Sequence, residues 1–139
     1  MKVLTVLVPT YNVEKYLRRC LDSLLLPEVL EEIEVLVVND GSKDGSADIA
    51  RAYEKKYPQT VVFVDKENGG HGSTINVGIE KAQGTYFKVL DSDDWVNIGD
   101  FIEFVKRLKE ETADAVICDY RKEHVYNGKS EYFEYKDLE

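Results

Sequence analysis

Short apolar segments alternate with amphipathic helical segments along most of this chain, and this alternation constrains the fold more than any other feature. Five segments are short, apolar and mostly β-branched, which is typical of strands buried on both faces of a sheet. They are residues 3–8, 33–38, 61–64, 86–90 and 115–118. Four segments between them repeat apolar residues at helical spacing; they are residues 13–25, 49–57, 75–82 and 101–108. The pattern predicts an α/β fold with a mostly parallel sheet and helices on both faces.

Residues that favour turns and helix ends mark the limits of several elements. Pro9 is expected to end the first strand, and Asn12 stands where the N-cap of the first helix belongs. Gly84 is the expected C-cap residue of the third helix. The apolar spacing of that helix places Ile79 on its buried face.

The composition supports a single domain and excludes several functional classes. With 139 residues, 43% of them hydrophobic, the chain is expected to form one domain over residues 1–139 with its own core. The 18 basic and 27 acidic side chains give a net charge of −9. This charge argues against a nucleic-acid partner and against binding to an anionic membrane surface.

The cysteines and the hydropathy favour a cytoplasmic location. Cys20 and Cys118 lie far apart in apolar patterns, as expected of buried thiols in a reducing compartment. The N-terminal apolar run has only the length of a strand and lacks a cleavage site, so no signal peptide is predicted. No run reaches the roughly 20 apolar residues of a membrane span. A membrane anchor elsewhere in a longer protein stays compatible with this interpretation.

The last part of the sequence has a different pattern. Residues 123–126 and 129–135 flank Asn127-Gly128, a strong hairpin signal, and a C-terminal hairpin is therefore expected. Its aromatic residues would expose apolar surface, which favours self-association of the chain through this hairpin. These residues are Tyr126, Tyr132, Phe133 and Tyr135.

The polar and glycine-rich segments of the chain directly follow the predicted strands. They are residues 9–12, 39–46, 65–72 and 91–95. In open α/β sheets, ligands bind beyond the carboxyl ends of the strands, near the point where the strand order reverses. The sequence therefore predicts a binding site at this one edge of the sheet.

The run Asp91-Ser92-Asp93-Asp94 at the end of an apolar strand is the sharpest chemical feature of the sequence. Its three carboxylates repel one another unless a cation or solvent relieves them. Mg²⁺ and Mn²⁺ take oxygen ligands and often bind one or two carboxylates together with substrate phosphates. A divalent metal site is one interpretation of this run, and a solvated acidic turn that caps the next helix is the other.

Three further residues are candidates for ligand contacts. Asp40 ends a buried strand at the ligand edge, where its carboxylate could accept hydrogen bonds from a base NH or a ribose hydroxyl. Tyr11, just past Pro9, is placed to stack on a flat ring, although a partly buried loop aromatic has the same pattern. His71 lies alone in a glycine-rich loop that matches neither common nucleotide fingerprint, and an unligated role is the simpler interpretation.

Four motifs in this order resemble those of the family 2 glycosyltransferases, over about residues 3–120. They are Pro9-x-Tyr11-Asn12, Asp40-Gly41-Ser42-x-Asp44-Gly45-Ser46, Asn68-x-Gly70 with Asn76-x-Gly78, and Asp91-Ser92-Asp93-Asp94. The resemblance implies a Rossmann-like GT-A fold and an inverting transfer of a sugar from a nucleotide-sugar donor. A UDP-sugar is the commonest donor in that family. A Mn²⁺ or Mg²⁺ cofactor and a glycan, lipid or protein acceptor are also implied.

The same resemblance implies roles for individual residues. Tyr11 would stack on the base with Thr10 beside it, and Asp40 would bind the base or the ribose. Asp91 and Asp93 would form the metal-binding pair, with Asp93 as the direct ligand. The implied donor-site residues are Pro9, Thr10, Tyr11, Asn12, Glu14, Asp40, Asn68, Asp91, Ser92 and Asp93.

The chain departs from the family pattern at two points. Many members carry an arginine where this chain has Ile75, so either His71 or Lys66 substitutes for it or donor binding differs. No residue after Asp114 matches the expected catalytic base, so the catalytic residue is not identified. These departures suggest the donor-binding part of a longer enzyme, truncated before its acceptor-side segment.

Two alternatives remain beside a glycosyltransferase. One is a non-catalytic module that binds nucleotide sugars without turning them over. The other is a phosphotransferase of the haloacid-dehalogenase kind, whose paired aspartates also end a strand. Trp95 stands where that motif requires threonine or valine, which disfavours the second alternative.

Overall fold

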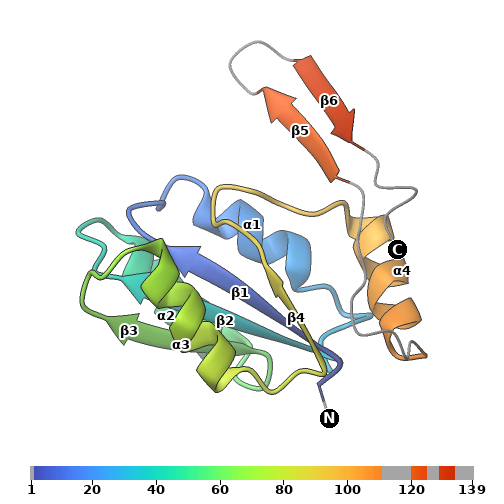
Figure 1. The fold of residues 1–139 in the computed structure, drawn as a ribbon, viewed down its shortest axis with the longest axis horizontal. Helices are drawn as coiled ribbons and strands as arrows, with labels where there is room; N and C mark the ends of the chain where they lie inside the picture. The colour runs from blue at the N-terminus through green and yellow to red at the C-terminus, as the bar shows by residue number, and fades with distance from the viewer. Residues whose placement is uncertain (1, 111–119, 125–128, 134–139) are drawn as a thin grey trace.

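The computed structural model of this protein describes residues 2–110, 120–124 and 129–133 (Figure 1). Strands and helices alternate through the first 108 residues, as the sequence predicts. The strands are β1 (Leu4–Thr10), β2 (Ile33–Asp40), β3 (Val61–Lys66) and β4 (Tyr86–Val89). The helices are α1 (Leu17–Leu24), α2 (Ser46–Lys56), α3 (His71–Lys81) and α4 (Ile98–Leu108). Strands β5 (Tyr120–His124) and β6 (Lys129–Phe133) follow.

The four main strands form one parallel sheet in the order β3-β2-β1-β4. Every residue of β1 and β2 is buried, because both strands lie in the middle of the sheet with helices on either side. This position explains why both strands are almost continuously apolar in the sequence. The predicted α/β architecture is confirmed.

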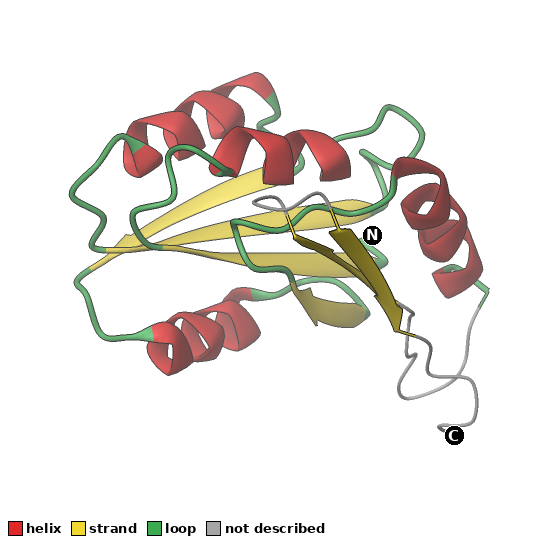
Figure 2. Cartoon of the chain, turned by 90° about the horizontal axis from the view of Figure 1, so that it is seen from above, coloured by secondary structure: helices red, strands yellow, loops and turns green. Residues whose placement is uncertain are grey.

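The sheet is covered by helices on both faces (Figure 2). On one face α1, α2 and α4 enclose the larger apolar cluster, which includes Val6 and Val35 of the sheet and Leu21 of α1, all completely buried. On the other face α3 covers a smaller cluster around Leu7 and Leu36. Burial of each such aliphatic side chain contributes about 1.5–3 kcal/mol, so the larger cluster is the main source of stability.

Two expectations about the start of the chain are wrong. The first strand continues through Pro9 to Thr10, because β4 pairs with β1 only up to Leu7 and leaves that side of β1 without a ladder at Pro9. Helix α1 begins at Leu17 with Tyr16 as its N-cap residue. Asn12 is therefore not an N-cap; its φ of 52° is left-handed, and its side chain bonds to another loop.

Two expectations about α3 are also wrong. The C-cap residue of this helix is Ala82, and Gly84 lies instead against the backbone of β1. Ile79 is 61% exposed, although its spacing places it on the apolar face. The helix approaches the sheet through Gly78, where an added Cβ would lie 2.7 Å from both Leu7 Cδ atoms, and this close approach turns Ile79 away from the sheet.

The expected C-terminal hairpin is present as an antiparallel pair, in which Tyr120 lies opposite Phe133 and His124 opposite Lys129. The paired strands begin earlier than predicted, at Tyr120. The fifth predicted strand, residues 115–118, and the Asn127-Gly128 turn lie outside the described residues. Self-association through the hairpin stays a prediction. Among the described helices, none has the length and apolarity that a membrane crossing requires.

Candidate functional site

The carboxyl ends of three strands meet in one row at the expected edge of the sheet. In the ladder register, Thr10 of β1 lies beside Asn39 of β2, and Asn39 lies beside Asp65 of β3. Asn39 Nδ2 donates to Asp65 Oδ1 at 2.9 Å. Because β1 has β2 on one side and β4 on the other, the strand order reverses next to β1, and this is where open α/β sheets bind ligands.

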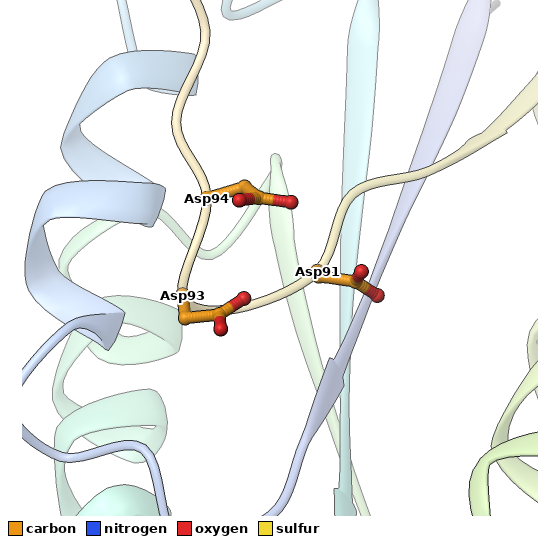
Figure 3. A group of neighbouring side chains, drawn as sticks. All are labelled: Asp91, Asp93 and Asp94. Carbon is orange, nitrogen blue, oxygen red and sulfur yellow. The ribbon is translucent and has the colours of Figure 1, made fainter. Parts of the chain in front are cut away.

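The loop after β4 brings Asp91, Asp93 and Asp94 together (Figure 3). All three side chains are exposed, and one carboxylate oxygen of each lies within 4.8 Å of the others. The turn is closed by Asp94 N, which donates to the Asp91 carbonyl oxygen at 2.9 Å. Ser92 between them is buried, so the segment directs its carboxylates outward and packs its serine inward.

The three carboxylates form a donor set that suits a hard divalent cation. Burial, followed by the charges of Asp93 and Asp91, raises the pKa of Asp94, and Arg19 partly offsets this effect. In the part of the chain that the structure describes, no lysine or arginine nitrogen lies within 4.0 Å of these carboxylates. A bound cation would therefore relieve a repulsion that no described ion pair relieves.

Helix α1 holds this acidic loop through three contacts. The thiol of Cys20 lies 3.8 Å from the Asp91 carbonyl oxygen, and Val96 N donates to Ser23 Oγ at 3.1 Å. The guanidinium of Arg19 lies 3.8 Å from the centre of the Trp95 ring. Burial and the three nearby aspartates raise the pKa of Cys20 to about 12, so its thiol stays protonated.

The carboxylate of Asp40, the last residue of β2, is buried and accepts three hydrogen bonds. Lys66 Nζ and Gly69 N each lie 2.8 Å from Oδ1, and Gly70 N lies 3.0 Å from Oδ2. Asn68 Nδ2 donates to the Asp40 carbonyl oxygen at 3.0 Å. Asp40 therefore fastens the loop between β3 and α3 to the end of β2. Since a carboxylate has about four lone-pair sites, it retains capacity for one further donor.

Burial alone would raise the pKa of Asp40. The hydrogen bond from Lys66 and those from the Gly69 and Gly70 amides outweigh burial and hold the pKa of this carboxyl below its ordinary value. Asp40 is consequently ionised at neutral pH and pairs with the Lys66 ammonium in a largely buried environment.

Tyr11 and Thr10 at the end of β1 differ in their surroundings. Tyr11 is 49% exposed, as a residue that offers its ring to a flat ligand must be. Thr10 is buried, and its hydroxyl donates to the Val8 carbonyl oxygen at 3.1 Å. Only Tyr11 of these two therefore presents its side chain to solvent at this edge.

The side chains of Asn12 and Glu14 bond to the neighbouring loop between β2 and α2. Asn12 Oδ1 accepts from Lys43 N at 2.8 Å, and Glu14 Oε2 accepts from Gly45 N at 3.0 Å. In return, Asp44 Oδ2 accepts from Glu14 N at 3.2 Å. The structure thus places these two expected donor-site residues in contacts between loops.

Ile75, at the position of the missing arginine, and the two residues considered as substitutes, Lys66 and His71, have distinct surroundings. The Lys66 ammonium is held by Asp40 and by the Glu67 carbonyl oxygen, at 2.8 and 2.6 Å. Ile75 packs against the smaller apolar cluster. His71 is exposed at the first position of α3. Of these residues, only His71 is a polar side chain without a described partner.

Several residues of the site could not be identified from their patterns. Asp94 was part of the acidic run but not of the predicted metal pair, and the structure adds it to the cluster. Arg19, Cys20 and Ser23 support the acidic loop from α1, about 70 residues earlier in the chain. Cys20 belongs to the apolar spacing of the helix and Arg19 and Ser23 do not, and none of the three positions gives a sign of this contact in the sequence.

A shallow cavity of about 300 Å³ lies between α1 and α2. Glu14 is the one expected donor-site residue in its lining, and the acidic cluster is not part of it. The cavity thus borders the loop between β2 and α2 through Gly45 and does not include the acidic cluster.

Comparison with known proteins shows which family this chain matches. Residues 5–133 match the family described as Glycosyl transferase family 2. The protein named "Putative glycosyltransferase EpsH" of Bacillus subtilis (strain 168) is 41% identical over 126 residues, which are 91% of this chain and 36% of EpsH.

Two groups of solved structures share the fold. S. aureus TarS 1-349 in complex with UDP-GlcNAc has a TM-score of 0.66 and 34% identity, covering 79% of this chain and 32% of TarS 1-349. The mannosyltransferase PcManGT from Pyrobaculum calidifontis, in complex with GDP-Man and Mn²⁺, has a TM-score of 0.63 and 28% identity. That match covers 74% of this chain and 31% of PcManGT. The chain thus spans about a third of the length of these proteins.

Proposed function

The chain belongs to glycosyl transferase family 2, and on this premise we propose that it binds a UDP-sugar with a divalent cation for inverting transfer of the sugar to an acceptor hydroxyl. The observation that carries the proposal is the cluster of three carboxylates within 4.8 Å at the strand-order reversal. The complexes of TarS with UDP-GlcNAc and of PcManGT with GDP-Man and Mn²⁺ support it. UDP is proposed over GDP because the TarS match has the higher identity.

The residues of this chain would divide the work of donor binding. Asp91 and Asp93, with Asp94 beside them, would hold Mn²⁺ or Mg²⁺, and the bound cation would offset the charge that develops on the leaving diphosphate. Tyr11 would stack on the uracil through its exposed ring. Asp40, ionised and with capacity for another donor, would accept a hydrogen bond from the base.

The acceptor side of the reaction requires a base that removes the proton of the attacking hydroxyl. We assign this role to no described residue of the chain. A cytoplasmic location is also part of the proposal, because Cys20 is a buried free thiol of the kind that reducing compartments contain. The haloacid-dehalogenase alternative is set aside because of the family membership.

Titration of UDP into the protein tests the proposed donor site. With Mn²⁺ or Mg²⁺ present, we expect UDP to bind at least about tenfold more tightly than in the presence of a chelator, since a cation held by the carboxylates would offset their repulsion of the diphosphate. Asp93→Asn should abolish the metal effect and leave the unfolding midpoint unchanged or slightly higher, because it removes one charge from a repulsive cluster. Isothermal titration calorimetry measures the affinities.

Asp100→Asn is the matched control, because Asp100 is an exposed aspartate in the next helix and outside the cluster. It should retain the full metal effect. Equal UDP affinity with and without metal would contradict the proposed site. Tighter binding of GDP than of UDP would contradict the choice of nucleotide. Donor binding without any donor hydrolysis would favour the non-catalytic alternative.

Replacement of Tyr11 tests the base platform. Tyr11→Ala should weaken UDP binding by about 1–2 kcal/mol, because it removes the stacking surface. Tyr11→Phe, which retains the ring, should bind UDP within about twofold of the wild type. The affinity for Mn²⁺ alone should be the same in all three proteins. If both variants bind UDP as the wild type does, Tyr11 is a loop residue without a role in the donor site.

A further inference from the structure

Two loops that precede helices α1 and α2 are joined by a set of reciprocal hydrogen bonds. Backbone N–H groups of the first loop donate to side chains of the second loop and of the first residue of α2: Asn12 N to Ser42 Oγ at 3.0 Å, Glu14 N to Asp44 Oδ2 at 3.2 Å, and Val13 N to Ser46 Oγ at 2.9 Å. We call this set, together with the return bonds from Lys43 N and Gly45 N, the loop clasp.

The loop clasp uses up the side chains that take part in it. Asp44 Oδ1 also accepts from Ser46 N at 3.0 Å, so both oxygens of Asp44 have partners within the protein. Burial would raise the pKa of Asp44, but the hydrogen bonds from Ser46 and Glu14 outweigh it and lower the pKa. These groups are therefore directed at the other loop, and a donor molecule would have to break existing bonds to reach them.

The clasp also maintains an unfavourable backbone conformation directly beside Tyr11. Asn12 has a φ of 52°, in the left-handed region that costs most residues with a Cβ about 1–2 kcal/mol and that asparagine tolerates better than most. Its backbone N–H and its side-chain oxygen both bond to the second loop, at Ser42 and Lys43. These two bonds hold Asn12 in this conformation, and Tyr11 is its neighbour in the chain.

We propose that Asp44, Ser46 and Glu14 are positioning residues, which act on the donor through Tyr11 and do not contact it. The inference rests on the proposed function, because Tyr11 needs a fixed orientation only if a nucleotide base stacks on it. It gives the second motif a physical role: the segment from Ser42 to Ser46 supplies the acceptors that hold the Tyr11 loop. It also changes the role expected of Glu14, from donor contact to loop contact.

Asp44→Ala tests the proposal, with Asp48→Ala as its matched control. Asp48 is an exposed aspartate in the first turn of α2, and its one ion pair among the described residues is with Arg51 of the same helix. Two quantities are measured for each variant, namely hydrogen exchange of the Val13 and Glu14 amides and the affinity for UDP with Mn²⁺. Both quantities are measured again for each variant combined with Tyr11→Ala in a double mutant.

Asp44→Ala should speed exchange of the Glu14 amide at least about tenfold, because this N–H loses its acceptor. The affinity for UDP should fall about tenfold when Tyr11 is present. In the Tyr11→Ala background the further loss should be less than about twofold, because the two changes act through one contact. Asp48→Ala should change neither quantity. Ser46→Ala removes the acceptor of the Val13 amide, so it should speed exchange of that amide and have the same effect on UDP affinity. It serves if Asp44→Ala does not fold.

Three outcomes would overturn the proposal. Unchanged amide exchange in both clasp variants would show that the clasp does not order the loop. Faster exchange with unchanged UDP affinity would overturn the positioning role alone. Full additivity with Tyr11→Ala would mean that Asp44 acts on the donor without Tyr11. A wild-type protein that binds no UDP would instead overturn the proposed function, and the role of Tyr11 would fall with it.

Discussion

Asp40→Asn is expected to lower the free energy of unfolding by about 3 kcal/mol, because it breaks a largely buried ion pair and leaves the Lys66 ammonium uncompensated. The side chains of Lys66 and Asp40 are 19% and 7% exposed, and their atoms lie 2.8 Å apart. The carboxylate accepts hydrogen bonds from Lys66, Gly69 and Gly70. An asparagine amide would place an NH₂ group opposite at least one of these donors, and that hydrogen bond would be lost. Urea denaturation at pH 7 measures the loss.

Asp65→Asn is the matched control, one strand further along the same edge. In the sheet register Asp65 lies beside Asn39, the residue before Asp40. Its side chain is 53% exposed, and its ion pair with Arg51 spans 3.4 Å. An exposed pair of this kind contributes about 0–1 kcal/mol, so the control should lose little stability. A loss for Asp40→Asn no larger than that of Asp65→Asn would contradict the role we give to the buried pair.

The stability difference between wild type and Asp40→Asn should depend on pH in one direction. Because the folded protein holds the pKa of Asp40 below its ordinary value, the carboxylate stabilises the fold fully at pH values above that ordinary value. The contribution is lost as the pH falls below about 4 and through the folded pKa. The difference in unfolding free energy should therefore be constant from pH 7 to about pH 5 and shrink at lower pH.

The same substitution reports on the donor site. If Asp40 accepts a hydrogen bond from the base, Asp40→Asn should weaken UDP binding and change the preference among uridine, guanosine and thymidine diphosphates. UDP affinity is measured at a temperature well below the thermal unfolding midpoint of Asp40→Asn, so that its reduced stability does not lower the fraction of folded protein. Unchanged affinity and unchanged preference would leave Asp40 with the loop-fastening role alone.

The strands, the layer arrangement and the site edge could be predicted from the sequence because each depends on one local pattern. Buried parallel strands such as β1 and β2 require continuous apolar runs, and the carboxyl ends of those runs lie at one edge. Asp91 and Asp93 follow such a run, which placed them at the edge correctly. Asp94 joins them because a tight turn closes between Asp91 and Asp94, which the spacing alone does not specify.

The start of α1 could not be predicted because a long-range contact overrides a local pattern. Val13 and Tyr16 continue the helical spacing of the apolar residues, yet the backbone N–H groups of residues 12–14 donate to side chains of a loop about 30 residues later. An N–H that is bound to another loop needs no helix cap, so the helix begins at Leu17. The position of Ile79 has a similar cause, since the contact of Gly78 with Leu7 sets the rotation of α3.

Gly84→Ala is expected to lower the free energy of unfolding by about 3 kcal/mol, because an added methyl group overlaps with backbone that cannot move away. A Cβ at this position would lie 2.5 Å from Thr5 N and 2.7 Å from the Leu4 carbonyl carbon. Gly84 N also donates to Thr5 Oγ1 at 2.8 Å, and the same hydroxyl donates to the buried Glu34 at 2.9 Å. A shift that relieves the overlap would therefore weaken a buried polar network.

Gly99→Ala is the control that separates this clash from the general effect of replacing a glycine. Among the described residues, a Cβ at Gly99 has Asn97 Oδ1 as its one neighbour within 4 Å, at 3.8 Å, and the residue lies in α4. Alanine there should stabilise the protein by about 0.5–1 kcal/mol, because it favours the helix and restricts the unfolded chain. Opposite signs for the two variants in urea denaturation are the expected result, and a neutral Gly84→Ala would contradict the close packing.

The position of Gly84 also connects the base of the sheet with the acidic cluster. Gly84 lies two residues before β4, and β4 leads directly to Asp91. β4 pairs with β1 from Tyr86 to Val89, so a displacement at its first residue changes its register or its angle against β1. If Gly84→Ala folds, its UDP affinity should show a smaller metal effect than that of Gly99→Ala, because the carboxylates of the cluster would be carried away from the carboxyl end of β1. The ratio of UDP affinities with and without metal in Gly84→Ala therefore shows whether the position of the acidic loop, after β4, depends on the contact between Gly84 and the β1 backbone, before β4.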